Sequence, residues 1–171
     1  QLLGNEQISA TEVAAIKMGT TVATNALLER KGDRTLLVTT RGFADALRIA
    51  YQNRPRLFDL EIKLPELLHE EVVEVEERID ARGKVLVAMN KQQARTEMKA
   101  AYERGIRSVA ILLMHGYRYT QHERLLKRIA EEIGFAQISV SHEVSPLMKL
   151  VGRGDTTVLD AYLSPVLRRY V

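Results

Sequence analysis

Apolar positions along the 171-residue chain recur at two spacings, one typical of helices and one typical of strands. The helical spacing predicts helices over residues 11–15, 22–30, 43–50, 91–102, 121–133 and 156–171. Short apolar runs predict strands at 16–18, 35–39, 108–114 and 137–141. Because parallel neighbours need crossover connections, this alternation predicts an α/β fold: a mainly parallel sheet with helices on both faces.

Asn90 is expected to cap the helix over 91–102, and Gly32 and Gly134 are expected to lie just past the helices over 22–30 and 121–133.

Three further local signals refine this outline. Alternating apolar residues at 73–79 and 85–87 surround a turn at 80–83, which predicts a hairpin as an antiparallel extension of the sheet. Thr120 and Glu123 have the spacing of a capping box at the start of a helix. Pro165 is expected to kink or split the last helix.

Composition indicates one globular domain over residues 1–171, since 46% of the residues are hydrophobic and 27% are charged. No run approaches the roughly 20 apolar residues of a membrane span, and the first residues lack an export pattern, so a cytoplasmic protein is expected. A chain that begins at Gln1 without a starting Met is expected to be a fragment of a larger subunit. The lack of cysteine excludes disulfides and thiol nucleophiles.

The net charge of +3 does not indicate a nucleic-acid-binding protein. Acidic and basic residues are interleaved along the chain, as on a solvated surface. Nucleic acid would require basic residues gathered on one face with aromatic residues among them, and only Arg48, Arg54 and Arg56 near Tyr51 come close.

Ligands of mainly parallel sheets bind beyond the carboxyl ends of the strands, which are expected at residues 19–21, 39–42, 115–117 and 141–143. The first candidate site follows Gly19, where a strand is expected to meet the start of a helix. Unpaired backbone N–H groups and the helix dipole favour an anion there, and Thr20 and Thr21 could add hydroxyl donors. Thr24 and Asn25 are poor helix formers in the first turn, so another contact would justify them. These four residues are candidates for binding a phosphate or a carboxylate. The alternative is that Thr20 or Thr21 only caps the helix.

The second candidate is Arg54, in a loop predicted over residues 52–65. A guanidinium can bind a carboxylate through two hydrogen bonds. The alternative is that Arg54 pairs with Asp59 or Glu61 on the surface. His142, just after a strand, could hold a water or a substrate proton, or could simply hydrogen-bond a loop. The four histidines are scattered, which makes a metal site within this chain unexpected. No catalytic residue can be named from the sequence.

The segment from Gly19 to Gly32, GTTVATNALLERKG, resembles the G-T-T-x-A-T-N-A-[LIV] stretch of the hydantoinase A/5-oxoprolinase family, in its N-terminal region. Further segments resemble family motifs in the same order: residues 38–45, 52–55, 58–60, 77–80, 112–117, 122–123, 143–146 and 156–163. The resemblance covers nearly the whole chain, and the order of the motifs makes it specific.

This resemblance implies part of an actin/sugar-kinase-like (ribonuclease H-like) fold and an enzyme that uses ATP, with Mg²⁺, to hydrolyse a cyclic amide such as 5-oxoproline or an N-methylhydantoin. It implies a B-type subunit or fused region as partner. A ketone carboxylase of the same family and a non-catalytic scaffold that docks the B-type subunit remain alternatives, and a homo-oligomer is left open.

The chain departs from the family pattern in two places. The glycine-rich D-x-G-G-T-F-T-D phosphate loop is not present, nor is the second half that completes the nucleotide cleft, so the fragment alone is expected to be inactive. Residues 152–157 read GRGDTT where the family has E-R-x-S-T-T, and Asp160 stands where Asn is common.

Overall fold

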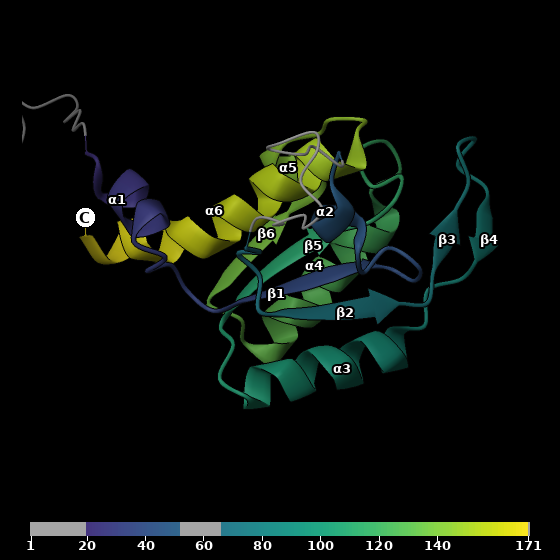
Figure 1. The fold of residues 1–171 in the computed structure, drawn as a ribbon. Coiled ribbons are helices and arrows are strands. Elements are labelled where there is room, and N and C mark those ends of the chain that lie inside the picture. The colour runs from purple at the N-terminus through teal and green to yellow at the C-terminus, as the bar shows by residue number, and fades with distance from the viewer. Residues whose placement is uncertain (1–19, 52–65, 171) are drawn as a thin grey trace, which may run out of the picture.

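The computed structural model describes residues 20–51 and 66–170. Its main sheet has four parallel strands in the order β2-β1-β5-β6 (Figure 1). These strands are β1 (Thr35–Thr40), β2 (Glu71–Val75), β5 (Ser108–Leu112) and β6 (Gln137–Val140). Every residue of the two central strands, β1 and β5, is buried, which is typical of parallel strands covered on both faces. The predicted parallel sheet is confirmed, and the strand expected at 16–18 lies outside the described residues.

Helices cover both faces of this sheet. The helices are α1 (Val22–Leu28), α2 (Ala46–Ile49), α3 (Lys91–Glu103), α4 (Gln121–Ile133), α5 (Ser141–Val144) and α6 (Leu150–Tyr170). Leu36 and Val38 of β1 belong to the core cluster under α3 and α4, whereas Leu37 points the other way, toward α2 and α6. Burying each of these side chains stabilises the fold by about 1.5–3 kcal/mol. Among the described helices, none combines the length and apolar content that crossing a membrane requires.

The hairpin forms, but it is shorter than predicted. The alternating run at 73–79 divides after Val75: its first part belongs to β2 and pairs in parallel with β1. Only β3 (Arg78–Ile79) and β4 (Val85–Val87) pair antiparallel, as a separate two-stranded sheet. The sequence pattern could not separate these roles, because a strand alternates in the same way in either sheet.

Helix ends follow local signals at some positions and long-range contacts at others. Asn90 caps α3 as predicted, its side-chain oxygen accepting from the Gln93 N–H at 3.1 Å. Gly134 ends α4 in the left-handed conformation, with φ 103°. The capping box predicted at Thr120 and Glu123 is wrong, because Thr120 makes no side-chain cap bond and Glu123 is fully buried.

The last helix is longer than predicted, and α1 packs on it. α6 begins at Leu150 and continues through Pro165 to Tyr170, so Pro165 does not split it. Ala26 of α1 forms a small cluster with Tyr162 and Leu163 of α6. Figure 1 shows this pair extending beyond the sheet, near the carboxyl end of α6.

The chain after α1 turns at a different residue from the expected one. Arg30 takes the left-handed conformation, with φ 56°, rather than Gly32. Gly32 instead lies directly against the ring of Tyr162, where any side chain would collide. The glycine is therefore explained by close packing on α6 rather than by a helix stop.

Candidate functional site

The residues predicted to bind an anion lie at the exposed start of α1. Thr20, Thr21, Thr24 and Asn25 are all exposed. The Thr20 hydroxyl accepts a hydrogen bond from the Val22 N–H at 3.2 Å, so one of the free amides is already occupied. No side-chain hydrogen bond ties Thr21, Thr24 or Asn25 to another described residue.

These residues do not meet the other predicted loops. The sequence predicts that the segment before α1 shares one edge with the loops after β1, β5 and β6. Because α6 runs back across the sheet and α1 packs on its carboxyl-terminal half, α1 lies near the start of β1 rather than its end (Figure 1). Arg54, the predicted carboxylate ligand, lies outside the described residues.

The loops after β1 and β5 do come together, around a buried carboxylate that sequence reasoning missed. Glu77 is 5% exposed and accepts from the Thr40 hydroxyl, while its other oxygen lies 2.7 Å from Nδ1 of His122. Thr40 in turn accepts from the Met114 N–H at 3.1 Å. This chain of contacts joins the end of β1 to the loop after β5 and the first turn of α4.

A second buried carboxylate, that of Glu123, joins β5 to β6. Its Oε1 accepts from the Leu113 N–H at 2.9 Å and from the Ser141 hydroxyl at 2.6 Å. Its Oε2 accepts from the His142 N–H at 3.2 Å and lies 2.7 Å from Nδ1 of the same residue. Four polar groups therefore surround a fully buried carboxylate, and they tie the ends of β5 and β6 to α4.

A buried cation completes this edge of the sheet. Arg153, on the first turn of α6, is fully buried and donates to the carbonyls of Leu113, Met114 and Leu147. Its guanidinium also lies over the ring of Tyr117, 5.4 Å from the centroid. Burial lowers the pKa of Arg153, and nearby Glu123 opposes that change. The side chain still carries its charge at neutral pH, because guanidinium ionises far above that range.

The two histidines of this edge each place Nδ1 2.7 Å from a buried carboxylate oxygen, His122 beside Glu77 and His142 beside Glu123. When Nδ1–H donates to a carboxylate, the tautomer is fixed and Nε2 is left as an acceptor. His142 follows β6 directly, and ligands of open α/β sheets bind beyond the carboxyl ends of the strands. The sequence points to His142 but not to its partner, because the spacing of Glu123 from Thr120 is that of a capping box. The signal available was that Glu123 lies three and seven residues before Leu126 and Ala130, on the buried face of α4.

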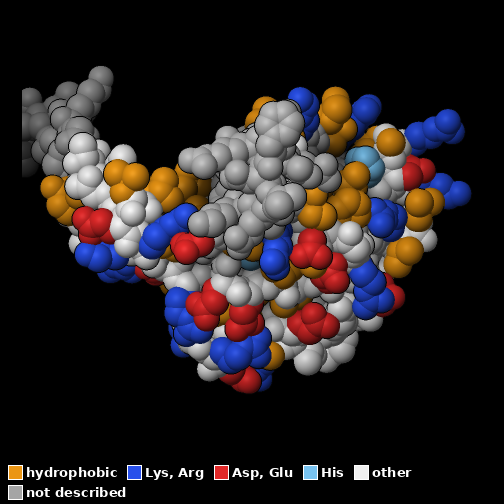
Figure 2. Space-filling model, in the orientation of Figure 1, with side chains coloured by type: hydrophobic (Ala, Val, Ile, Leu, Met, Phe, Trp, Pro, Cys, Tyr) orange, Lys and Arg blue, Asp and Glu red, His pale blue; other side chains and the backbone are white. Residues whose placement is uncertain are grey.

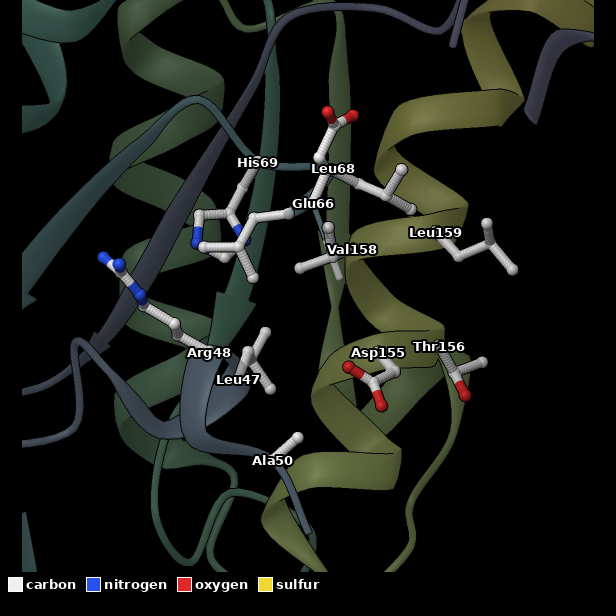
Figure 3. A pocket seen from close by; sticks show the side chains of 11 residues that line it. Leu47, Arg48, Ala50, Glu66, Leu68, His69, Asp155, Thr156, Val158 and Leu159 are labelled. Atoms are coloured by element: carbon white, nitrogen blue, oxygen red, sulfur yellow. The ribbon is translucent and has the colours of Figure 1, made fainter. Parts of the chain in front are cut away.

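A separate pocket of about 380 Å³ lies between α2, the segment before β2, and α6 (Figure 3). Its wall is mostly apolar, formed by Leu47, Leu68, Val158 and Leu159. His69 and Asp155 project toward the same space from different elements. Burial lowers the pKa of His69 and raises that of Asp155. Both shifts favour the neutral forms, as an apolar wall requires.

Within residues 20–51 and 66–170, no group of three or more His, Cys, Asp or Glu side chains is placed to hold a metal ion. At the start of α1, the described residues present only exposed side-chain hydroxyls and one side-chain amide.

The chain is similar to known proteins over most of its length. The family described as the hydantoinase/oxoprolinase N-terminal region matches residues 1–134. The 5-oxoprolinase of Dictyostelium discoideum is 39% identical over 99% of the chain, and 5-oxoprolinase 1 of Arabidopsis thaliana is 39% identical over 96%. The chain spans only 15% and 14% of the length of these relatives. The acetophenone carboxylase gamma subunit of Aromatoleum aromaticum is 32% identical over 86% of the chain and 22% of that protein.

Two solved structures share the fold. The ATP-dependent caprolactamase from Pseudomonas jessenii matches with a TM-score of 0.78 and 28% identity, covering 89% of this chain and 23% of that one. A nucleotide-free acetone carboxylase matches with a TM-score of 0.74 over 86% of this chain and 23% of that one, and its 23% identity supports the fold alone. These likenesses agree with the α/β actin-like fold expected from the sequence.

Proposed function

Because the chain belongs to the hydantoinase/oxoprolinase family, in its N-terminal region, we propose that it is one domain of a longer ATP-dependent enzyme that hydrolyses a cyclic amide of the 5-oxoproline or N-methylhydantoin type. We propose further that this enzyme is cytoplasmic and that it works with a B-type subunit or fused region. The 171 residues alone are proposed to be inactive, since they span about 15% of the curated 5-oxoprolinases.

The observation that carries the proposal is the 39% identity to a 5-oxoprolinase across 99% of the chain. The caprolactamase adds a second relative that is named for opening a lactam and for using ATP. An unstrained lactam resists attack by water because the amide is resonance-stabilised. When bound, ATP with Mg²⁺ would supply a phosphoryl group that converts the carbonyl oxygen into a leaving group.

We propose that the chain itself contributes groups that bind a phosphate or the substrate. The exposed hydroxyls of Thr20, Thr21 and Thr24 and the amide of Asn25 would donate to a phosphate or to the substrate. The remaining ligands would come from outside these residues. Arg54 would bind a substrate carboxylate in the two-bonded geometry that guanidinium favours.

The test is a chimaera in which this chain replaces the matching segment of the Dictyostelium discoideum 5-oxoprolinase. We expect 5-oxoproline to stimulate release of inorganic phosphate by the chimaera, and we expect none from the isolated chain. A chimaera that folds like its parent but is not stimulated would contradict the proposal.

Substitutions in the same chimaera test the residues. Thr21→Ala and Arg54→Ala should each reduce kcat/KM at least about tenfold, because a hydrogen bond to a charged group contributes about 1.5–3 kcal/mol. Thr96→Ala and Arg128→Ala, at exposed positions on α3 and α4, are the matched controls and should leave kcat/KM unchanged. Equal kinetics for all four variants would refute the site assignment, though not the family activity.

The second candidate function is that of a ketone carboxylase subunit, which the 32% identity to an acetophenone carboxylase subunit favours. It predicts turnover of a ketone that depends on bicarbonate and does not respond to 5-oxoproline. A scaffold that only docks the B-type subunit predicts that Thr21→Ala leaves the activity unchanged.

A further inference from the structure

Strand β4 exposes apolar side chains on both of its faces. Val85, Leu86 and Val87 are 44%, 56% and 43% exposed, and successive side chains of a strand point to opposite sides. Its neighbour β3 differs, because Ile79 is only 4% exposed and anchors that strand in the core. No face of β4 is therefore buried, although all three of its residues are strongly apolar.

The outer edge of β4 is also open. β3 and β4 form a two-stranded sheet, so β4 has a strand partner on one side only among the described residues. Figure 1 shows this hairpin projecting from the body of the molecule. It is held by Tyr119, whose ring lies against Gly83 and whose hydroxyl donates to the Ala81 carbonyl at 3.2 Å. An anchored and apolar edge strand is a template for pairing with another strand.

The charge of the hairpin indicates what would pair with it. Arg78, Arg82 and Lys84 are basic, and Asp80 is the one acidic residue between 78 and 87. The Asp80 carboxylate already accepts from the N–H groups of Arg82 and Lys84, at 2.8 and 2.9 Å. Figure 2 shows Lys and Arg beside hydrophobic side chains at the end of the molecule where the hairpin lies. A complementary segment would therefore carry apolar and acidic residues.

We propose that β4 is a docking edge for an extended segment of alternating apolar and acidic residues, contributed by the part of the longer polypeptide outside these 171 residues. Relatives of this chain carry much more polypeptide, since it covers 15% of the Dictyostelium 5-oxoprolinase and 23% of the caprolactamase. The added strand would pair with the open edge of β4 and cover Val85, Leu86 and Val87. This inference rests on the length of the relatives and not on the proposed activity.

Hydrogen exchange tests the proposal, with the isolated chain compared with the chimaera described above. In the isolated chain, the amides of 85–87 that face away from β3 should exchange quickly, whereas in the chimaera these amides should exchange at least about tenfold more slowly, as paired amides do. Leu86→Lys should abolish the protection in the chimaera. Met148→Lys, at another apolar residue that is 72% exposed, should leave it intact.

Two outcomes would overturn the proposal. Fast exchange of 85–87 in a folded chimaera would show that no strand covers the edge. Protection that already appears in the isolated chain and increases with protein concentration would assign the edge to a second copy instead. Neither reading depends on turnover, so this test can fail while the proposed activity holds.

A peptide experiment keeps the proposal testable if the chimaera does not fold. A seven-residue peptide alternating Glu and Val, added to the isolated ¹⁵N-labelled chain, should shift the amide resonances of 85–87. The same peptide with its central residue replaced by Pro lacks a backbone donor and should bind more weakly, as should a peptide with Lys in place of Glu. Equal responses to the three peptides would contradict strand pairing.

Discussion

Replacement of Glu123 by Gln tests the buried network at the carboxyl ends of the strands, and we expect it to lower the free energy of unfolding by about 2–4 kcal/mol. The carboxylate accepts at both oxygens: Oε1 from the Leu113 N–H and the Ser141 hydroxyl, and Oε2 from the N–H and Nδ1 of His142. Gln has nearly the same shape, but it places an NH₂ donor where one of these acceptors stood.

The size of this loss depends on which of the four groups around Glu123 can still bond to a Gln side chain. A hydroxyl can turn to accept, and an imidazole can change tautomer, but a backbone N–H cannot. The NH₂ group must therefore face the N–H of either Leu113 or His142. A buried donor left without a partner costs about 1–3 kcal/mol, and the remaining bonds lose the strength that the negative charge gave them. Together these effects give the stated range.

The assay is urea unfolding of the isolated chain at neutral pH, followed by circular dichroism and linear extrapolation. Glu131→Gln, at an exposed position on the same helix, is the matched control and should change the stability by less than about 0.5 kcal/mol. If the two variants were equally stable, the carboxylate of Glu123 would not hold the loops after β5 and β6 together.

Two further predictions concern α6. Gly154→Ala should destabilise the chain by about 1–2 kcal/mol net of the helix gain, because the added methyl carbon would lie 2.5 Å from side-chain carbons of both Leu47 and Leu112. Gly152→Ala is the control and should stabilise the chain by up to about 1 kcal/mol, since the added methyl carbon would lie no closer than 3.4 Å to any other atom outside its own helix turn. Thermal melts that rank the two variants the other way would refute this packing. Burial raises the pKa of Asp155 above 3.8, so the folded state binds this proton more tightly than the unfolded state does. The wild type therefore loses stability as the pH rises through the pKa that Asp155 has in the folded state. Asp155→Asn should therefore stabilise the chain at pH 7 but not below pH 3.8, and equal effects at both pH values in urea titrations would contradict this.

The sequence predicted those parts of the fold that depend on local pattern. The buried run of β1, the Asn90 cap and the Gly134 stop were all identified from residues within one or two turns of each other. Glu123 shows where this approach fails. Its spacing from Thr120 is that of a capping box, and only contacts with β5 and β6 reveal that the carboxylate points into the core.

The candidate site was predicted in part, for the same reason. The loops after β1, β5 and β6 meet as expected, because the carboxyl ends of parallel strands share one edge. The position of Thr20 and Thr21 depends instead on α1 packing against Tyr162, more than 130 residues away in the chain. A pattern within a short stretch of sequence cannot predict a contact between residues so far apart.

The most direct test of the central claim is the yield of glutamate from 5-oxoproline in the chimaera, measured together with ADP. Ring opening driven by ATP predicts that glutamate forms only when ATP is present and that one glutamate appears for each ADP. ADP formed without glutamate, or turnover of a ketone that depends on bicarbonate, would contradict the assignment of this chain to a cyclic-amide hydrolase.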